Sequence, residues 1–180
     1  DIVQETDRLT RITENLLRLT RLDSGMLPEA QRVDLSSVMA RVVRMLRLVA
    51  EEKQVDLSYE IRREGQTLAS EDEIHEIIYN LTENAIKYNR PGGVEKLLLA
   101  GDEKDCLLTV SDNGIGIPEG DMPRIFARFS RVDKMRSRAA GGTGLGLSLA
   151  AAPARRRGGR LAVRARAGGG AGVTVGLTRC

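Results

Sequence analysis

Residues 73–89 read EIHEIIYNLTENAIKYN and combine an apolar helix face with a polar one. Asn80, Asn84 and Lys87 are spaced by four and three residues, so they share one face of the predicted helix. Side-chain carbonyl oxygens suit magnesium, and a lysine can neutralise phosphate oxygens. This face therefore predicts either a magnesium and phosphate site or a merely solvated helix surface. The apolar residues expected to face the core are Ile77, Ile78, Leu81, Ala85 and Ile86.

Two glycine-rich turns follow this helix in the sequence. Residues 112–118 read DNGIGIP and come after the apolar strand CLLTVS, which places Asp112 at the end of that strand. A carboxylate there can accept a hydrogen bond from the exocyclic amine of adenine, and Gly114 and Gly116 allow the backbone to approach a base closely. Residues 141–147, GGTGLGL, place backbone amides at a helix start, which favours a polyphosphate. Together the three motifs predict a nucleotide pocket.

The first residues predict a separate helix. Ile2, Leu9 and Leu16 are seven residues apart, and Ile12 and Leu19 fill the alternate positions, so this helix carries an apolar stripe that needs partner helices. Gly25 and Pro28 end it. We therefore expect a helix over residues 1–25, a linker over 26–33 and one domain over 34–180.

Within that domain, Asp34 is predicted to cap a helix, and Ser70 with Glu73 to form a capping box at the start of the next one. Alternating apolar residues predict strands near 55–61, 68, 94–100, 107–111, 161–166 and 173–177. Helices beside a mainly antiparallel sheet make a two-layer α/β sandwich of the α+β class. The face expected to be buried on the first of these helices is Leu35, Val38, Val42, Met45, Leu46 and Val49.

Charge is distributed unevenly along the chain. Residues 1–133 hold 18 basic and 25 acidic residues, a net charge of −7, whereas the remainder holds 10 basic residues and no acidic one. A basic region can meet an anion or be simply solvated. Aromatic residues for stacking bases are scarce, so we expect no nucleic-acid partner. Cys106 and Cys180 lack metal-ligand spacing and are expected to be reduced.

The ordered motifs resemble those of the catalytic, ATP-binding domain of sensor histidine kinases of two-component systems, in the superfamily that includes DNA gyrase. NLTENAIKYN is similar to the N box, DNGIGIP and GGTGLGL to the two glycine boxes, and FARF to the phenylalanine box. RLTRITENLLRLTRLDSG resembles the second helix of the dimerisation and phosphotransfer domain. The resemblance covers nearly the whole chain.

The resemblance implies a role for individual residues. Asn84 would bind Mg²⁺, Asn80 and Lys87 would lie beside the phosphates of ATP, and Tyr88 would lie at the rim of the site. Asp112 would hold the adenine amine above Gly114 and Gly116, with Thr174 beside the base. The residues implied to reach or close over the phosphates are Arg131, Arg136, Gly142, Gly144 and Gly146.

The resemblance also implies an activity and partners. Hydrolases of the superfamily resemble one another in having a glutamate general base at the position of Asn80, and an amide cannot activate water. The sequence therefore favours a kinase that transfers the γ-phosphate of ATP to a histidine for relay to a response regulator. The expected setting is a homodimer, formed through the first helix, in the cytoplasmic portion of a membrane-bound sensor. His75, the only histidine, is expected to be a surface or supporting residue, so the chain should not phosphorylate itself.

Two other functions stay open. One is an ATP-hydrolysing conformational machine of the same superfamily. The other is a degenerate dimerisation or interaction module that no longer binds ATP. Residues 150–159, AAAPARRRGG, support the second alternative, because an interior proline costs roughly 3 kcal/mol of helix stability. We expect the helix that contains Pro153 to be short, kinked or poorly ordered.

Overall fold

The computed structural model describes residues 2–23, 29–116, 146–165 and 169–180. Its main sheet has five strands in the order β2-β4-β5-β7-β6. The β2–β4 pair is parallel, and the other three pairs are antiparallel. The strands are β2 (Asp56–Ile61), β4 (Val94–Gly101), β5 (Asp105–Asp112), β6 (Arg160–Ala165) and β7 (Ala171–Thr178).

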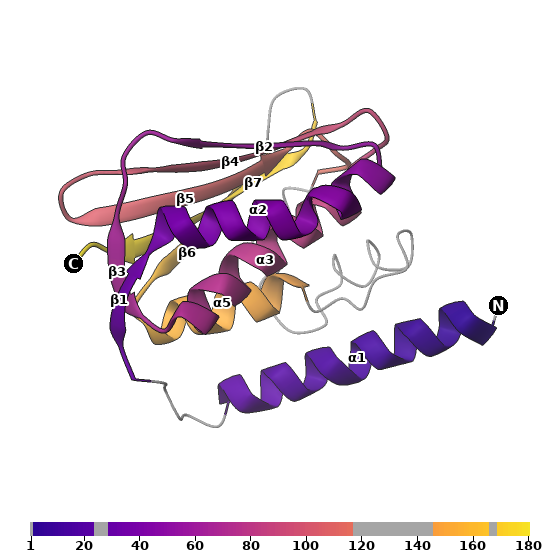
Figure 1. The fold of residues 1–180 in the computed structure, drawn as a ribbon, viewed down its shortest axis with the longest axis horizontal. Helices are drawn as coiled ribbons and strands as arrows, with labels where there is room; N and C mark the ends of the chain where they lie inside the picture. The colour runs from indigo at the N-terminus through magenta and orange to yellow at the C-terminus, as the bar shows by residue number, and fades with distance from the viewer. Residues whose placement is uncertain (1, 24–28, 117–145, 166–168) are drawn as a thin grey trace.

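Three helices lie against one face of this sheet (Figure 1): α2 (Leu35–Glu52), α3 (Glu71–Lys87) and α5 (Gly146–Arg156). The apolar core lies between the two layers, because strand residues such as Leu97, Leu99 and Leu108 are buried together with Ile74 and Ile77 of α3. The predicted two-layer α/β sandwich with a mixed, mainly antiparallel sheet is confirmed.

A second, two-stranded sheet was not predicted. β1 (Gln31–Asp34) pairs antiparallel with β3 (Gln66–Ala69), with Val33 opposite Thr67. Residues 31–33, which we assigned to a linker, therefore belong to the folded domain. Sequence patterning missed β1 because only Val33 of its four residues is buried, so the strand has no apolar alternation.

The predicted cap of α2 is confirmed, but part of its predicted buried face is wrong. Asp34 accepts a hydrogen bond from the Ser36 backbone N–H at 3.0 Å. Met45 and Val49, which we expected to be buried, are exposed. The helix instead turns its other flank toward the core, and that flank carries Met39, Val43 and Ala50.

Helix α5 continues through Pro153, so the proline does not break it. The helix has 11 residues and ends three positions after Pro153, whose side chain is buried. Proline has no N–H to donate to the preceding turn, so α5 needs support from outside itself. Arg157 ties the end of α5 to α3, because its Nη2 and Nε donate to Glu73 Oε1 and Oε2 at 2.6 and 3.0 Å.

The same ion pair changes the prediction for the start of α3. Ser70 Oγ accepts from the Glu73 backbone N–H at 3.1 Å, as a capping box requires. The Glu73 carboxylate, however, binds Arg157. Because Glu73 lies at the start of α3 and Arg157 directly follows α5, the two helices run antiparallel.

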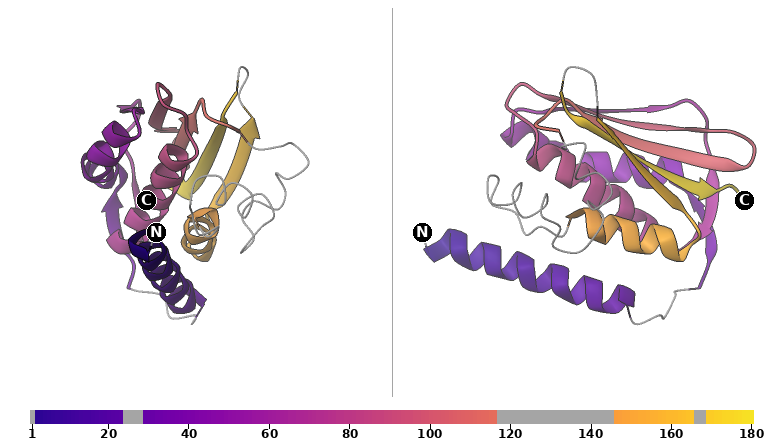
Figure 2. Two further views of the ribbon diagram at one scale, coloured as in Figure 1. Left: turned by 90° about the vertical axis from the view of Figure 1, so that its right-hand side faces the viewer. Right: turned by 180° about the vertical axis from the view of Figure 1, so that it is seen from behind.

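Helix α1 (Ile2–Asp23) lies next to α5, on the side of the helical layer away from the sheet (Figure 2). Its bounds agree with the predicted first helix. Ile2 and Leu9 are exposed and Ile12 is half-buried. Leu16 and Leu19 have side chains outside the described part of the structure. Among the described helices, none is long and apolar enough to cross a membrane.

Candidate functional site

The polar face of α3 has little solvent exposure, which distinguishes it from an ordinary solvated helix face. Asn80 is 6% exposed and Asn84 is 9% exposed, while Lys87 is half-buried. Within the described residues, Asn80 Nδ2 has no hydrogen-bond partner. Buried amides are nearly always satisfied in folded proteins. An unsatisfied amide beside a second buried asparagine therefore marks a place suited to a polar ligand.

The C-terminal end of α3 supports the first glycine turn. Tyr88 is the C-cap residue of α3 and is buried, and its carbonyl accepts from the Ile115 N–H at 3.3 Å. The Lys87 ammonium lies 6.0 Å from the centroid of the Tyr88 ring. The backbone of Tyr88 thus ties the polar face of α3 to the turn.

The turn after β5 is held in one conformation by Asp112 and by its glycines. Asp112 is 6% exposed, and its Oδ1 accepts from the Gly114 N–H at 2.9 Å. A Cβ atom on Gly114 would lie 2.6 Å from the Tyr88 carbonyl oxygen, so any larger residue would push the turn off α3. Gly116 has a φ of +75°, which favours glycine. Backbone geometry alone therefore accounts for the glycines at positions 114 and 116, with or without a bound base.

Gly170 is a part of this site that the sequence analysis missed. Its φ is +88°, and a Cβ atom there would collide with the Asp112 carbonyl oxygen. The residues just before β7 are therefore packed directly against the turn. The signal was present in the run Gly168-Gly169-Gly170, which we did not connect with Asp112.

Glu95 is the second residue that the sequence analysis missed. It lies on β4 directly opposite Asp112 on β5, and its side chain is 0% exposed. Among the described residues, neither carboxylate oxygen has a hydrogen-bond partner. Burial, and secondarily the charge of Asp112, raises the pKa of Glu95 well above its ordinary value of 4.5. The signal in the sequence was that Glu95, Leu97 and Leu99 are two residues apart and so share one face of the strand, which is the core face.

We predict that replacing Glu95 by leucine stabilises the domain at neutral pH by about 1–3 kcal/mol, the usual cost of an unsatisfied buried polar group. An acid with a raised folded-state pKa contributes full stability below its unfolded value of 4.5 and loses that stability as the pH rises through the folded-state value. Urea unfolding at pH 5 and pH 8 measures this. The advantage of Glu95→Leu should be larger at pH 8, and an equal advantage at both pH values would contradict the assignment.

The structure does not bring Thr174 into this site, which corrects the prediction. On β5 the buried residues Cys106, Leu108, Val110 and Asp112 alternate with residues facing away from the helices. Thr174 pairs with Thr109, and the two hydroxyl oxygens are 2.9 Å apart. Thr174 therefore lies on the opposite face of the sheet from Asp112.

The start of α5 approaches the polar face of α3. Because the ion pair between Glu73 and Arg157 makes the two helices antiparallel, Gly146 at the start of α5 lies toward the C-terminal half of α3. The first turn of a helix has backbone N–H groups without helical partners, and these favour an anion. The other predicted phosphate residues, Arg131, Arg136, Gly142 and Gly144, lie outside the described residues.

His75 lies apart from the polar face of α3. Its ring stacks on Tyr79 with 5.7 Å between centroids, and Nε2 lies 3.4 Å from Met45 Sδ on α2. It is a half-buried residue between two helices. This placement agrees with the prediction of a supporting residue.

Comparison with known proteins decides the family. Residues 69–179 match the family of histidine kinase-, DNA gyrase B- and HSP90-like ATPases. The chain belongs to this ATPase family. The sensor-like histidine kinase SenX3 of Mycolicibacterium smegmatis is 34% identical over 143 residues, which cover 79% of this chain and 37% of SenX3. The probable sensor histidine kinase TcrY of Mycobacterium tuberculosis is 34% identical, over 79% of this chain and 30% of TcrY.

Solved structures support the fold of this ATPase domain. Full-length ShkA in complex with AMPPNP has a TM-score of 0.82 and 23% identity, over 96% of this chain and 36% of ShkA. The chain thus spans less than two fifths of the length of each of these three proteins. The resemblance to the catalytic domain of sensor histidine kinases is confirmed.

The donor atoms at the site limit the kinds of metal it could hold. In the described ranges, no group of three or more His, Cys, Asp or Glu side chains could hold a metal ion. The buried oxygen of Asn84 suits a hard cation that takes its other ligands from water and from a bound phosphate.

Proposed function

We propose that the chain binds Mg²⁺-ATP and transfers the γ-phosphate to a histidine, as the catalytic part of a sensor histidine kinase. One observation carries the proposal: the buried asparagine face of α3 adjoins the Asp112 turn, and the Asn80 amide in that face has no hydrogen-bond partner in the part of the chain that the structure describes. Asn80 cannot act as a general base toward water, so nothing at this position favours hydrolysis.

Each residue of the site has a positioning role in this proposal. Asp112 accepts a hydrogen bond from the adenine amine and orients the nucleotide. Asn80 and Lys87 bind phosphate oxygens from α3, and the amides at the start of α5 bind them from the opposite side. Asn84 supplies an oxygen ligand to Mg²⁺, which neutralises the phosphate charge. Phosphoryl transfer depends mainly on such positioning and charge neutralisation.

The wider assignment concerns the whole protein. We propose that it forms a homodimer through α1, whose apolar residues Ile2 and Leu9 are exposed. The phosphorylated histidine would pass its phosphate to a cognate response regulator. The domain would act on the cytoplasmic side of a membrane-bound sensor. Arg131, Arg136, Gly142 and Gly144 are proposed as further phosphate contacts.

We predict that Asn84→Ala lowers the affinity for AMPPNP in the presence of magnesium by about 10-fold or more, because a ligand to the cation is lost. Binding without magnesium should change by less than about threefold. Calorimetric titration with AMPPNP and with ADP, each with and without magnesium, measures both effects. Thr174→Val is the matched control, since Thr174 lies on the far face of the sheet, and its binding should equal that of the wild type.

The same titration separates the two other functions. A folded wild-type chain that binds neither nucleotide would favour the interaction module. Steady release of phosphate from ATP by the chain alone would favour the ATP-hydrolysing machine. Magnesium-dependent binding with negligible hydrolysis is the result that the kinase proposal requires.

A further inference from the structure

One of the two residues paired directly with Glu95 on the neighbouring strands is the base-recognition residue proposed above. The partner of Glu95 on β2 is the apolar Leu57, and its partner on β5 is Asp112. The Asn113 N–H donates to the Val94 carbonyl at 3.3 Å, so Val94 and Asn113 form a hydrogen-bonded pair. Such pairs alternate with non-hydrogen-bonded ones in an antiparallel sheet, so the next pair, Glu95 and Asp112, is non-hydrogen-bonded. In such pairs the Cβ atoms stand roughly 4.5–5.5 Å apart, which puts the Asp112 carboxylate within reach of the Glu95 carboxyl.

The chemistry of the two groups is complementary. Two carboxylates side by side in a water-excluded place cannot both be charged, so one of the two carries a proton. Glu95, at 0% exposure, is the more deeply buried of the two. A protonated carboxyl is a hydrogen-bond donor, and an ionised one only accepts. Within the described residues the Glu95 oxygens have no hydrogen-bond partner.

We propose that Glu95 is a positioning residue for base recognition, which donates its carboxyl O–H to Asp112 when a nucleotide is bound. The proton stays on Glu95. Asp112 Oδ1 already accepts from the Gly114 N–H at 2.9 Å, so a second donor would fix the plane of the carboxylate. The remaining acceptor sites of Asp112 would then be aimed at the adenine amine. This inference rests on the proposed function of Asp112.

The test compares two nucleotides and two substitutions at position 95. Inosine 5′-diphosphate (IDP) carries a carbonyl oxygen where ADP carries the amine. We expect the wild type to prefer ADP over IDP by about 10-fold or more. Glu95→Leu should lower the affinity for ADP about 10-fold, the loss expected for one hydrogen bond to a charged group, and should change the affinity for IDP by less than about threefold. Glu95→Gln keeps a donor and should retain the affinity for ADP.

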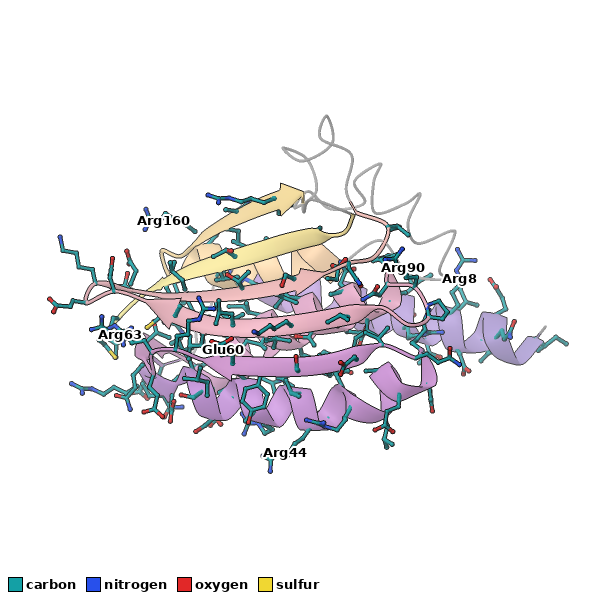
Figure 3. The ribbon with its side chains drawn as sticks, turned by 90° about the horizontal axis from the view of Figure 1, so that it is seen from above. Arg8, Arg44, Glu60, Arg63, Arg90 and Arg160 are labelled. Carbon is teal, nitrogen blue, oxygen red and sulfur yellow. The ribbon has the colours of Figure 1, made fainter. Side chains whose placement is uncertain are left out.

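A matched control removes a carboxylate from the other face of the sheet. Glu60 on β2 binds Lys96 at 2.6 Å and Arg62 at 2.8 Å, and Figure 3 labels it. Glu60→Leu should leave both nucleotide affinities unchanged. Thermal unfolding without nucleotide separates folding from recognition, because Glu95→Leu is predicted to be more stable than the wild type.

The outcomes distinguish a failure of the role of Glu95 from a failure of the proposed nucleotide binding. If Glu95→Leu binds ADP as the wild type does, or loses ADP and IDP equally, Glu95 has no positioning role. The same conclusion follows if Glu95→Gln loses as much affinity for ADP as Glu95→Leu. If the folded wild type binds no ADP, the proposed function fails first, and the role of Glu95 is refuted with it.

Discussion

Replacing Asp112 by alanine is expected to lower the affinity for ADP by about 100-fold, which corresponds to about 2.7 kcal/mol. The buried carboxylate is the group at the turn that can accept from the adenine amine, and a hydrogen bond to a charged group contributes about 1.5–3 kcal/mol. Calorimetric titration with ADP measures the change. Asp112→Asn should also bind ADP weakly, because the N–H donors of the asparagine amide can lie against the N–H donors of the adenine amine.

The control for this prediction lies on the same strand. Asp105 is at the other end of β5, where its Oδ2 accepts from exposed Arg160 at 3.2 Å. Figure 3 labels Arg160 near the edge of the sheet. Asp105→Ala removes the same kind of side chain and should leave ADP binding unchanged. Wild-type affinity in Asp112→Ala, with a normal unfolding transition, would exclude Asp112 from the site.

Replacing Arg157 by alanine is expected to lower the free energy of unfolding by about 3–5 kcal/mol, the typical cost of breaking a buried ion pair. The Arg157 and Glu73 side chains are only 11% and 6% exposed, and the guanidinium donates two hydrogen bonds to the carboxylate. Truncation leaves the Glu73 carboxylate buried without this partner. Urea denaturation at pH 7 measures the loss.

Two further variants sharpen the result. Arg160→Ala breaks an exposed pair and should cost less than about 1 kcal/mol. Glu73→Leu combined with Arg157→Leu removes both charges and should be more stable than Arg157→Ala alone, because no unpaired charge is left. A loss below about 1 kcal/mol in Arg157→Ala would show that α5 does not depend on this ion pair.

Much of the fold was predictable because local signals agree with the tertiary structure. The apolar spacing in α3, the Asp34 and Ser70 caps and the alternation in β4 and β5 each identify an element that also buries its apolar face. The β1 strand gave no such signal, since its pairing with β3 depends on residues more than 30 positions away. Local patterning carries no information about a pairing of that kind.

The site was predictable to a smaller extent. Asn80, Asn84 and Asp112 follow from spacing and from the end of a strand, and the structure buries all three. The prediction for Thr174 was wrong because the sequence does not give the register of its strand with β5. A shift of one residue in that register moves a side chain to the other face of the sheet. The ion pair of Arg157 with Glu73 could not be predicted, because the two residues are 84 positions apart in the sequence.

The burial of Glu95 sets heat resistance and ligand recognition against each other at one position. A random library of this domain selected for survival on heating should enrich leucine and other apolar residues at position 95, because they remove a carboxyl that the core does not satisfy. The same library selected for retention on immobilised ADP should keep glutamate or glutamine there. Two selections on one library would therefore rank the same residues in opposite order.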